Sequence, residues 1–190
     1  RDALEAQGIE SFLMDYTEAD SISALVRDVV AKSGGRIDAL FNNGAYGQPG
    51  AVEDLPTEAL RAQFETNVFG WHELTRQVIP FMRRRGEGRI VQCSSILGLV
   101  PYRYRGAYTA SKFALEAVSM SMRAELARRS IAVIVVRPGP VATPFRANAV
   151  RAEGMVGYDA PDPRAQSAED VARRTLRAVD RKKAVVETSA

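Results

Sequence analysis

The feature that most constrains the fold is an alternation of short apolar runs with longer amphipathic stretches. The apolar runs are rich in Ile, Val and Leu and predict buried strands at Ile9–Met14, Ile37–Phe41, Arg89–Cys93 and Ala132–Arg137. The other stretches have helical spacing and predict helices at Ser21–Lys32, Thr57–Arg84, Tyr104–Arg129 and Ala168–Asp180. Strands that are apolar along their whole length suit a sheet that helices cover on both faces. The sequence therefore predicts a doubly wound α/β fold with a parallel sheet.

The ends of these helices carry residues suited to capping. Thr57 and Ser167 stand directly before helical runs, and their hydroxyls can accept hydrogen bonds from free amide groups of the first turn. Gly34, Gly35 and Gly86 follow the ends of two helices, where a left-handed backbone favours glycine. We therefore predict that Thr57 and Ser167 are N-caps and that these glycines end the helices before them.

Length and composition indicate one domain. With 190 residues, of which 46% are apolar, the chain is long enough for one sizeable core and too short for two full domains. We therefore expect residues 1–190 to form a single domain. The segment 139–165 is rich in glycine and proline, so it is predicted to be a long loop that forms a lid over the sheet.

Charge and cysteine content exclude several classes of protein. The 26 basic and 23 acidic residues are dispersed, so we expect no nucleic-acid partner. Cys93 is the only cysteine, which excludes a disulfide framework and favours a reducing compartment. No apolar run approaches the roughly 20 residues that cross a bilayer, and no signal-peptide core is present. The expectation is a cytoplasmic protein without a membrane span and without a metal site.

Polar or turn-forming residues follow each predicted strand. Asp15, Asn42-Asn43-Gly44, Ser94-Ser95 and Pro138-Gly139 occupy these positions in chain order. In an open parallel sheet the ligand crevice lies beyond the carboxyl ends of the strands. We therefore expect all four groups to face one crevice.

A tyrosine and a lysine begin the third long helix in the sequence Tyr108-Thr109-Ala110-Ser111-Lys112. Residues four apart share a helix face, so the phenol and the ammonium can approach each other. A nearby cation lowers the pKa of a tyrosine from its ordinary value of about 10 and suits it to acid-base catalysis. Such pairs are also ordinary on solvated helices. Ser95, thirteen residues earlier at a strand end, makes the catalytic interpretation the better one.

Taken together, these motifs resemble those of the classical short-chain dehydrogenase/reductase family. The likeness runs from Asp15 to about Thr143, and the order Gly44-Ala45 is similar to that of the subgroup near aldehyde, retinol and hydroxysteroid reductases. The matching pieces are Asp15-Tyr16, Asn42-Asn43-Gly44-Ala45, Asn67-Val68-Phe69-Gly70, Ser94-Ser95-Ile96-Leu97-Gly98, Tyr108–Lys112 and Arg137-Pro138-Gly139-Pro140-Val141-Ala142-Thr143.

The resemblance implies an oxidoreductase that transfers hydride between NAD(P)(H) and an alcohol or carbonyl compound. It implies that Tyr108 is the acid in reduction and the base in oxidation, and that Lys112 lowers its pKa and holds the nicotinamide ribose. Ser95 would hydrogen-bond the substrate oxygen where negative charge develops. Asn67 would bend its helix and hold a water that relays protons to Lys112.

The same resemblance implies a set of cofactor contacts. Asp15 and Tyr16 would contact the adenine, and Asn42, followed by Gly44, would lie beside the adenosine ribose. Val141 and Thr143 would meet the nicotinamide carboxamide. The complete expected set is Asp15, Tyr16, Asn42, Gly44, Tyr108, Lys112, Pro138, Gly139, Val141 and Thr143. The expected cofactor is NADP or NAD, with NADPH favoured.

Apolar residues near the site predict a lipophilic aldehyde or ketone as substrate, because ligand pockets are mostly apolar with few polar anchors. They are Tyr46, Leu97, Leu99, Val100, Tyr102 and Tyr104, with Phe145, Met155, Val156 and Tyr158 from the lid. A stripe of small residues on the catalytic helix has two interpretations, a homodimer or homotetramer interface, as the resemblance implies, or close packing on the chain's own sheet. The stripe is Ala110, Ala114, Ala117, Ser121 and Ala124.

Two other functions remain open. The first is a non-catalytic regulatory or binding protein that retains the fold, although the joint presence of Ser95, Tyr108, Lys112 and Asn67 argues for chemistry. The second is an epimerase or dehydratase that uses the same tyrosine and lysine. Relatives of that kind usually carry a larger C-terminal substrate domain.

The sequence shows no glycine-rich turn of the kind that begins a dinucleotide-binding sheet, where a helix N-terminus holds the pyrophosphate. Arg1–Gln7 has the pattern of a helix end closed by Gly8, and nothing before Ile9 supplies the strand and the turn. We therefore expect a Rossmann-type domain that is N-terminally incomplete and lacks its first βαβ segment. The residues that choose between NAD and NADP would lie in that segment.

This expectation predicts that the 190-residue chain made alone binds NAD(P)H poorly and has low solubility, because the pyrophosphate site and a neighbouring strand are missing. Adding the upstream βαβ segment is expected to restore both cofactor binding and stability. Fluorescence titration of NADPH and NADH into the two proteins measures the difference. Tight binding by the 190-residue chain would contradict the prediction.

Overall fold

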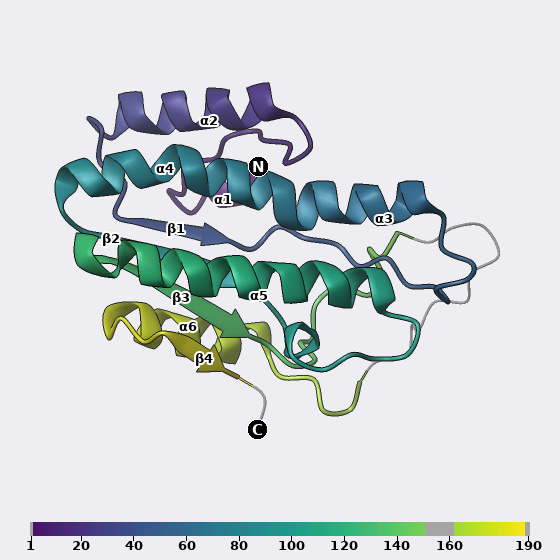
Figure 1. The fold of residues 1–190 in the computed structure, drawn as a ribbon. Helices are drawn as coiled ribbons and strands as arrows, with labels where there is room; N and C mark the ends of the chain where they lie inside the picture. Colours follow the sequence, from purple (N-terminus) through teal and green to yellow (C-terminus); the bar gives the residue numbers. More distant parts are fainter. Residues whose placement is uncertain (1, 151–161, 189–190) are drawn as a thin grey trace.

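The computed structural model describes residues 2–150 and 162–188, and their central element is a four-stranded parallel sheet (Figure 1). The strands are β1 (Ala39–Asn42), β2 (Gly88–Cys93), β3 (Ile131–Arg137) and β4 (Val185–Glu187), in that spatial order. Six residue pairs join β2 to β3, from Gly88 with Ile131 to Cys93 with Val136. The predicted parallel α/β class is confirmed.

Helices cover both faces of this sheet, as apolar strands require. In Figure 1, α4 and α5 run along one face, α6 lies behind the other face, and α2 packs outside α4. The helices are α1 (Asp2–Glu5), α2 (Ala19–Lys32), α3 (Thr57–Phe64), α4 (Trp71–Arg85), α5 (Gly106–Leu126) and α6 (Ala168–Asp180). A π-helical segment, η1 (Glu65–Gly70), joins α3 to α4, and short 3-10 helices lie at η2 (Ile96–Gly98) and η3 (Ala127–Arg129).

Two buried clusters correspond to the two faces. Ile90 and Val133 point into the cluster formed with α2, α4 and α5, whereas the neighbouring Val91 and Ile134 point into the cluster under α6. Side chains alternate between the two faces along each strand, so an apolar run of this kind fills both clusters at once. The core therefore lies on both sides of β2 and β3.

The capping predictions have different outcomes. Ser167 caps α6 as predicted, its hydroxyl accepting a hydrogen bond of 3.0 Å from the Asp170 amide. Gly86 ends α4 with a φ of 81°, and Gly35, with a φ of 84°, donates its amide to Val30. The prediction for Thr57 is wrong, because α3 already begins at Thr57 and the N-cap is Pro56, which makes no side-chain cap bond.

The strand predictions also need two corrections. Ile9–Met14 is not a strand, because no other described strand lies beside it to complete a ladder. β1 is therefore the edge strand of the described sheet, and its residue Phe41 is half exposed. The short β4 was not predicted, since a run of three residues is too short to show a period.

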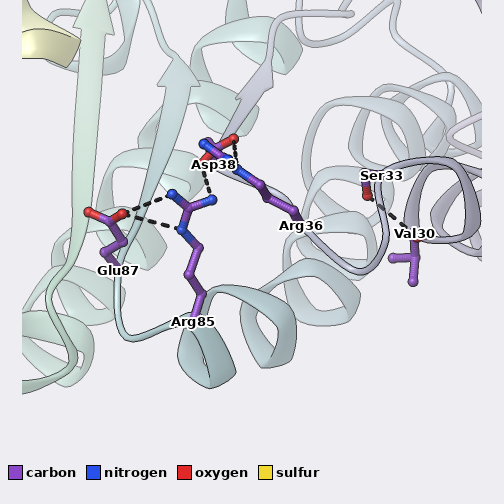
Figure 2. A network of polar contacts seen from close by, with 6 residues as sticks. All are labelled: Val30, Ser33, Arg36, Asp38, Arg85 and Glu87. Carbon is purple, nitrogen blue, oxygen red and sulfur yellow. Dashed lines mark hydrogen bonds and ion pairs between the residues drawn. The ribbon is translucent and has the colours of Figure 1, made fainter.

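An ion network closes the end of the sheet opposite the expected crevice (Figure 2). Arg36 donates two hydrogen bonds to Asp38, and Arg85, in the last turn of α4, forms ion pairs with both Asp38 and Glu87. The hydrogen bonds from Arg36 lower the pKa of the Asp38 carboxyl. These groups are exposed and screened, so the network orients the end of α4 against β1 and β2 and contributes little stability for each pair.

Because Ser167 is a cap and Thr57 is not, replacing each of them by alanine is expected to have different effects on stability. Ser167→Ala removes a hydrogen bond to an otherwise free amide and is expected to lower the free energy of unfolding by about 1 kcal/mol. Thr57→Ala removes no cap bond and is expected to change it by less than about 0.5 kcal/mol. Urea unfolding of both variants measures the difference. Equal losses would show that Ser167 does not act as a cap.

Candidate active site

The turn that follows β2 carries Ser95 and is fixed to the end of β3. The Ser94 amide donates to Val136 at 2.8 Å, and the Ile96 amide donates to Pro138 at 3.0 Å. Ser95 caps η2, and its hydroxyl accepts a hydrogen bond of 3.1 Å from the Leu97 amide. The carboxyl ends of β2 and β3 are thus joined at the point where Ser95 projects.

Tyr108 lies in the first turn of α5, close to this serine. Burial of the Tyr108 side chain raises the pKa of its phenol, and the nearby Ser95 hydroxyl, which favours the phenolate, only partly offsets this shift. Ser95 and Tyr108 are therefore brought together, as the sequence predicts. A phenol with a raised pKa remains protonated at neutral pH and is an acid there.

Lys112 is buried one turn further along α5. Its ammonium donates a hydrogen bond of 2.7 Å to the Cys93 carbonyl and lies 4.5 Å from the centre of the Trp71 ring. It is 5.5 Å from the centre of the Tyr108 ring. Burial lowers the pKa of Lys112 to about 8, although the nearby Glu116 opposes the shift.

The predicted effect of Lys112 on Tyr108 is not observed in this structure. The pKa of Tyr108 is raised rather than lowered, because loss of water around the phenol is the largest influence on it. The Lys112 ammonium lies over the tyrosine ring and binds the Cys93 carbonyl, so it is not hydrogen-bonded to the phenol oxygen. Tyr108 and Lys112 do lie close together, but burial of the phenol determines the direction of its pKa shift.

Asn67 lies in the π-helical segment between α3 and α4, which confirms that the helix departs from α geometry there. Its buried amide accepts from the Tyr46 amide at 3.3 Å and donates to the Tyr46 carbonyl at 3.0 Å. It also donates to the Ser111 hydroxyl at 3.2 Å. Asn67 therefore joins α5 to the loop that follows β1. Single π-turns of this kind are frequent at functional sites.

Tyr16 approaches the start of α4 so closely that two glycines are required. A Cβ at Gly70 would lie 2.3 Å from the Tyr16 carbonyl oxygen, and one at Gly44 would lie 2.8 Å from the Tyr16 ring. Trp71 packs against this ring at 6.3 Å and donates its indole N–H to the Gly44 carbonyl at 2.7 Å. The sequence analysis did not identify Trp71, which here connects Tyr16, Gly44 and Lys112.

The two predicted adenosine contacts have different surroundings. Asp15 is exposed, and its carboxylate accepts two hydrogen bonds of 2.8 Å from Thr17, which lower its pKa. Asn42 is fully buried, and its amide donates to Thr75 at 2.9 Å and to Gln92 at 3.0 Å. The Asn42 side chain therefore joins β1 to α4 and β2, and the contact of this residue with a ribose stays a prediction.

The segment after β3 turns back over Tyr108. Val141 forms a bridge with Gln166, and Thr143 accepts a hydrogen bond of 3.4 Å from the Phe145 amide. The Phe145 ring meets the Tyr108 ring edge to face, with centroids 5.7 Å apart. Residues 139–150 and 162–165 of the predicted lid are described, whereas Met155, Val156 and Tyr158 lie outside the described residues.

The Lys112 ammonium keeps N–H donors that a sugar hydroxyl could use. A lysine ammonium has three N–H donors, and in the described part of the chain Lys112 uses one of them, on the Cys93 carbonyl. Two donors of a buried cation therefore remain for neighbouring hydroxyls. Pro138 and Gly139 follow directly after the last residue of β3, and their contact with a cofactor stays a prediction.

Metal-binding clusters and membrane-spanning helices are both absent from the described ranges. These ranges contain no group of three His, Cys, Asp or Glu side chains that could hold a metal ion. None of the helices in residues 2–150 and 162–188 is long and apolar enough to cross a membrane.

Comparisons with known sequences agree with this geometry. A family model described as short chain dehydrogenase matches residues 2–154. The chain is 37% identical over 145 residues to the uncharacterized oxidoreductase YbbO of Escherichia coli (strain K12), covering 76% of this chain and 54% of that protein. It is 38% identical over 129 residues to retinol dehydrogenase 8 of Homo sapiens, covering 68% and 42%. The chain thus spans about half the length of these curated relatives.

Solved structures show the same fold. A short-chain dehydrogenase from Streptomyces avermitilis superposes with a TM-score of 0.86 at 31% identity, covering 98% of this chain and 73% of that one. A short chain dehydrogenase/reductase from Burkholderia phymatum, solved in complex with NAD, superposes with a TM-score of 0.84 at 25% identity, covering 98% and 74%. The four-stranded sheet and its helices are therefore a Rossmann-like arrangement.

The buried lysine predicts a pH-dependent stability. The folded protein releases the Lys112 proton near pH 8, whereas the unfolded chain holds it up to about pH 10.4, the ordinary lysine pKa. Between these values the unfolded state binds more protons, so stability rises with pH. From pH 7.5 to pH 10, we expect the free energy of unfolding to rise by about 2 kcal/mol more than in Lys112→Met.

Urea unfolding of the native protein and of Lys112→Met at both pH values measures this difference. Groups other than Lys112 titrate in both proteins and cancel in the comparison. Parallel pH profiles in the two proteins would show that the buried ammonium does not have a depressed pKa.

Proposed function

The chain belongs to the short-chain dehydrogenase family, and we propose that the protein transfers hydride between NADP(H) or NAD(H) and an alcohol or carbonyl substrate. The observation that carries the proposal is the convergence of Ser95, Tyr108 and Lys112 at the carboxyl ends of β2 and β3. Three groups from two elements meet there with the chemistry that carbonyl reduction needs. Asn67 supports α5 from behind through Ser111.

In the direction of reduction, Tyr108 is the proton donor. Burial keeps its phenol protonated at neutral pH, so it can deliver a proton to the carbonyl oxygen. The Ser95 hydroxyl can hydrogen-bond the same oxygen and stabilise its developing negative charge. The nicotinamide, when bound, supplies the hydride.

Lys112 has two functions in the proposed mechanism. With a pKa of about 8, the ammonium is mostly charged at neutral pH, and its two remaining N–H donors can bind the nicotinamide ribose hydroxyls. The same charge, 5.5 Å from the Tyr108 ring, favours the phenolate that remains after proton transfer. Alcohol oxidation uses that phenolate as its base.

We propose a lipophilic aldehyde or ketone as substrate and NADPH as the preferred cofactor. The loop after Ser95 supports the substrate class, because Leu99, Val100, Tyr102 and Tyr104 are all about half exposed or more. An apolar surface beside a polar reaction centre suits a lipophilic ligand. The 38% identity to a protein named retinol dehydrogenase 8 agrees with this substrate class.

We also propose that the protein is a homodimer or homotetramer. Four members of the small-residue stripe on α5, namely Ala110, Ala117, Ser121 and Ala124, are exposed, so the stripe does not pack on the chain's own sheet. Phe113, Val118 and Met120 on the same helix also expose 39–60% of their surface. An exposed apolar patch of this kind supports an interface between subunits.

The central test is Tyr108→Phe in the full-length protein. Removing the phenol oxygen removes the proton donor, so kcat for carbonyl reduction is expected to fall by at least about a hundredfold. The dissociation constant of NADPH, measured by fluorescence titration, is expected to change by less than about twofold, because the phenol is assigned to the proton transfer. Near-normal steady-state reduction by this variant would refute the assignment of Tyr108, and a wild-type protein that binds no NAD(P)H would favour a non-catalytic function.

A further inference from the structure

The loop that follows β1 is held by two buried amide side chains one helical turn apart. Gln63, at the end of α3, is fully buried and accepts a hydrogen bond of 2.8 Å from the Gln48 amide. It also donates one of 2.9 Å to the Tyr46 carbonyl. Asn67 binds the same Tyr46 peptide from the next turn.

Gln63 binds the backbone of this loop with both ends of its side-chain amide. A buried amide is unfavourable unless it is hydrogen-bonded, and here both partners are peptide groups on either side of Gly47. The consequence of these two bonds is a fixed path for residues 46–48.

Gly47, at the apex of this path, supports the segment that covers the active-site tyrosine. Its carbonyl accepts a hydrogen bond of 3.1 Å from the Val150 amide. A Cβ built on Gly47 would lie 3.5 Å from the Phe145 ring, so a side chain at this position would meet the ring. Phe145 in turn meets the Tyr108 ring edge to face at 5.7 Å. Gln63 is therefore linked, through the loop and the hydrogen bond between Val150 and Gly47, to the segment whose Phe145 meets Tyr108.

We propose that Gln63 is a positioning residue that holds residues 46–48 in place, keeps Phe145 against Tyr108 and thereby limits the bulk of the carbonyl substrate that reaches the phenol. This inference rests on the proposed function. Gln63 does not touch the reacting atoms and acts through the loop. Its effect is on which substrates reach Tyr108.

The proposal predicts a loss of discrimination when Gln63 is replaced by leucine. The substitution leaves the Gln48 amide and the Tyr46 carbonyl without their buried partner, so the loop must shift to find others. The segment that carries Phe145 then loses its hydrogen bond between Val150 and Gly47, and a bulky group beside the substrate carbonyl is tolerated. Hexanal and pivalaldehyde test this directly, because pivalaldehyde carries three methyl groups on the carbon next to the carbonyl.

The test compares Gln63→Leu, Phe145→Ala and Gln77→Leu in the full-length protein. Gln77 is a matched control, since its side-chain amide also makes two hydrogen bonds, to Ser23 at 2.9 Å and to Glu73 at 2.7 Å. Gln77 lies within α4, and neither of these bonds reaches the loop after β1. We expect the ratio of kcat/KM for hexanal over pivalaldehyde to fall about tenfold in Gln63→Leu and Phe145→Ala. The ratio is expected to stay unchanged in Gln77→Leu.

Three further readouts separate positioning from a general loss of stability. The NADPH dissociation constant is expected to stay within about twofold of the wild-type value in all three variants. Gln63→Leu and Phe145→Ala combined are expected to lower the ratio no further than either alone, because they act on one contact. Gln63→Glu keeps the acceptor for the Gln48 amide and is expected to retain part of the discrimination, which also tests the proposal if the leucine variant does not fold.

An unchanged ratio in Gln63→Leu, or an equal fall in Gln77→Leu, would overturn the proposal. If the wild-type protein reduced neither aldehyde, the proposed function would be in question while the loop contact remained testable. Tryptic cleavage after Arg146, which adjoins Phe145, would then be measured by mass spectrometry. Faster cleavage in Gln63→Leu than in Gln77→Leu supports the contact, and equal rates overturn it.

Discussion

The arrangement of the site depends on one buried positive charge. The Lys112 ammonium is removed from water and must be stabilised by what surrounds it, namely the Cys93 carbonyl and the faces of the Trp71 and Tyr108 rings. One turn further along α5, Glu116 lies near enough to favour the charged form of Lys112. Glu116 also forms a nearly buried, bidentate ion pair with Arg137. Two buried charged residues of α5 thus join it to the sheet, Lys112 to the end of β2 and Glu116 to the end of β3.

Close packing also holds the turn that carries Ser95 against α5, the helix that carries Lys112. A Cβ on Gly98 would lie 2.7 Å from the Ser94 hydroxyl and 3.0 Å from Glu116, so only glycine lets the turn after β2 rest on α5. Gly70 has the same effect at the other end of the site, where it admits the backbone of Tyr16 beside Trp71. The arrangement of the candidate site therefore depends on Gly98 and Gly70, where a side chain would collide with its neighbours.

Burial shifts the pKa values of the two titrating groups in opposite directions. It raises the pKa of the Tyr108 phenol and lowers that of the Lys112 ammonium, because in each case it disfavours the charged form. The tyrosine consequently remains an acid at neutral pH, and the lysine remains a cation that titrates closer to neutrality. The proposed carbonyl reduction would use both groups in the states that the structure favours, whereas the proposed alcohol oxidation would need the phenolate that burial opposes.

The sequence by itself determined the strands β1, β2 and β3, most helix boundaries and the candidate site residues. Apolar periodicity located β1, β2 and β3, and local chemistry located the Ser167 cap and the Gly86 helix end, because these features depend on neighbours along the chain. Only the tertiary structure decided that Asn42 is buried, that Ile9–Met14 lacks a strand partner, and that Trp71 and Gln63 support the site. It also decided the direction of the Tyr108 pKa shift. Burial and hydrogen-bond partners come from residues distant in sequence, and a single sequence does not state which distant residues meet.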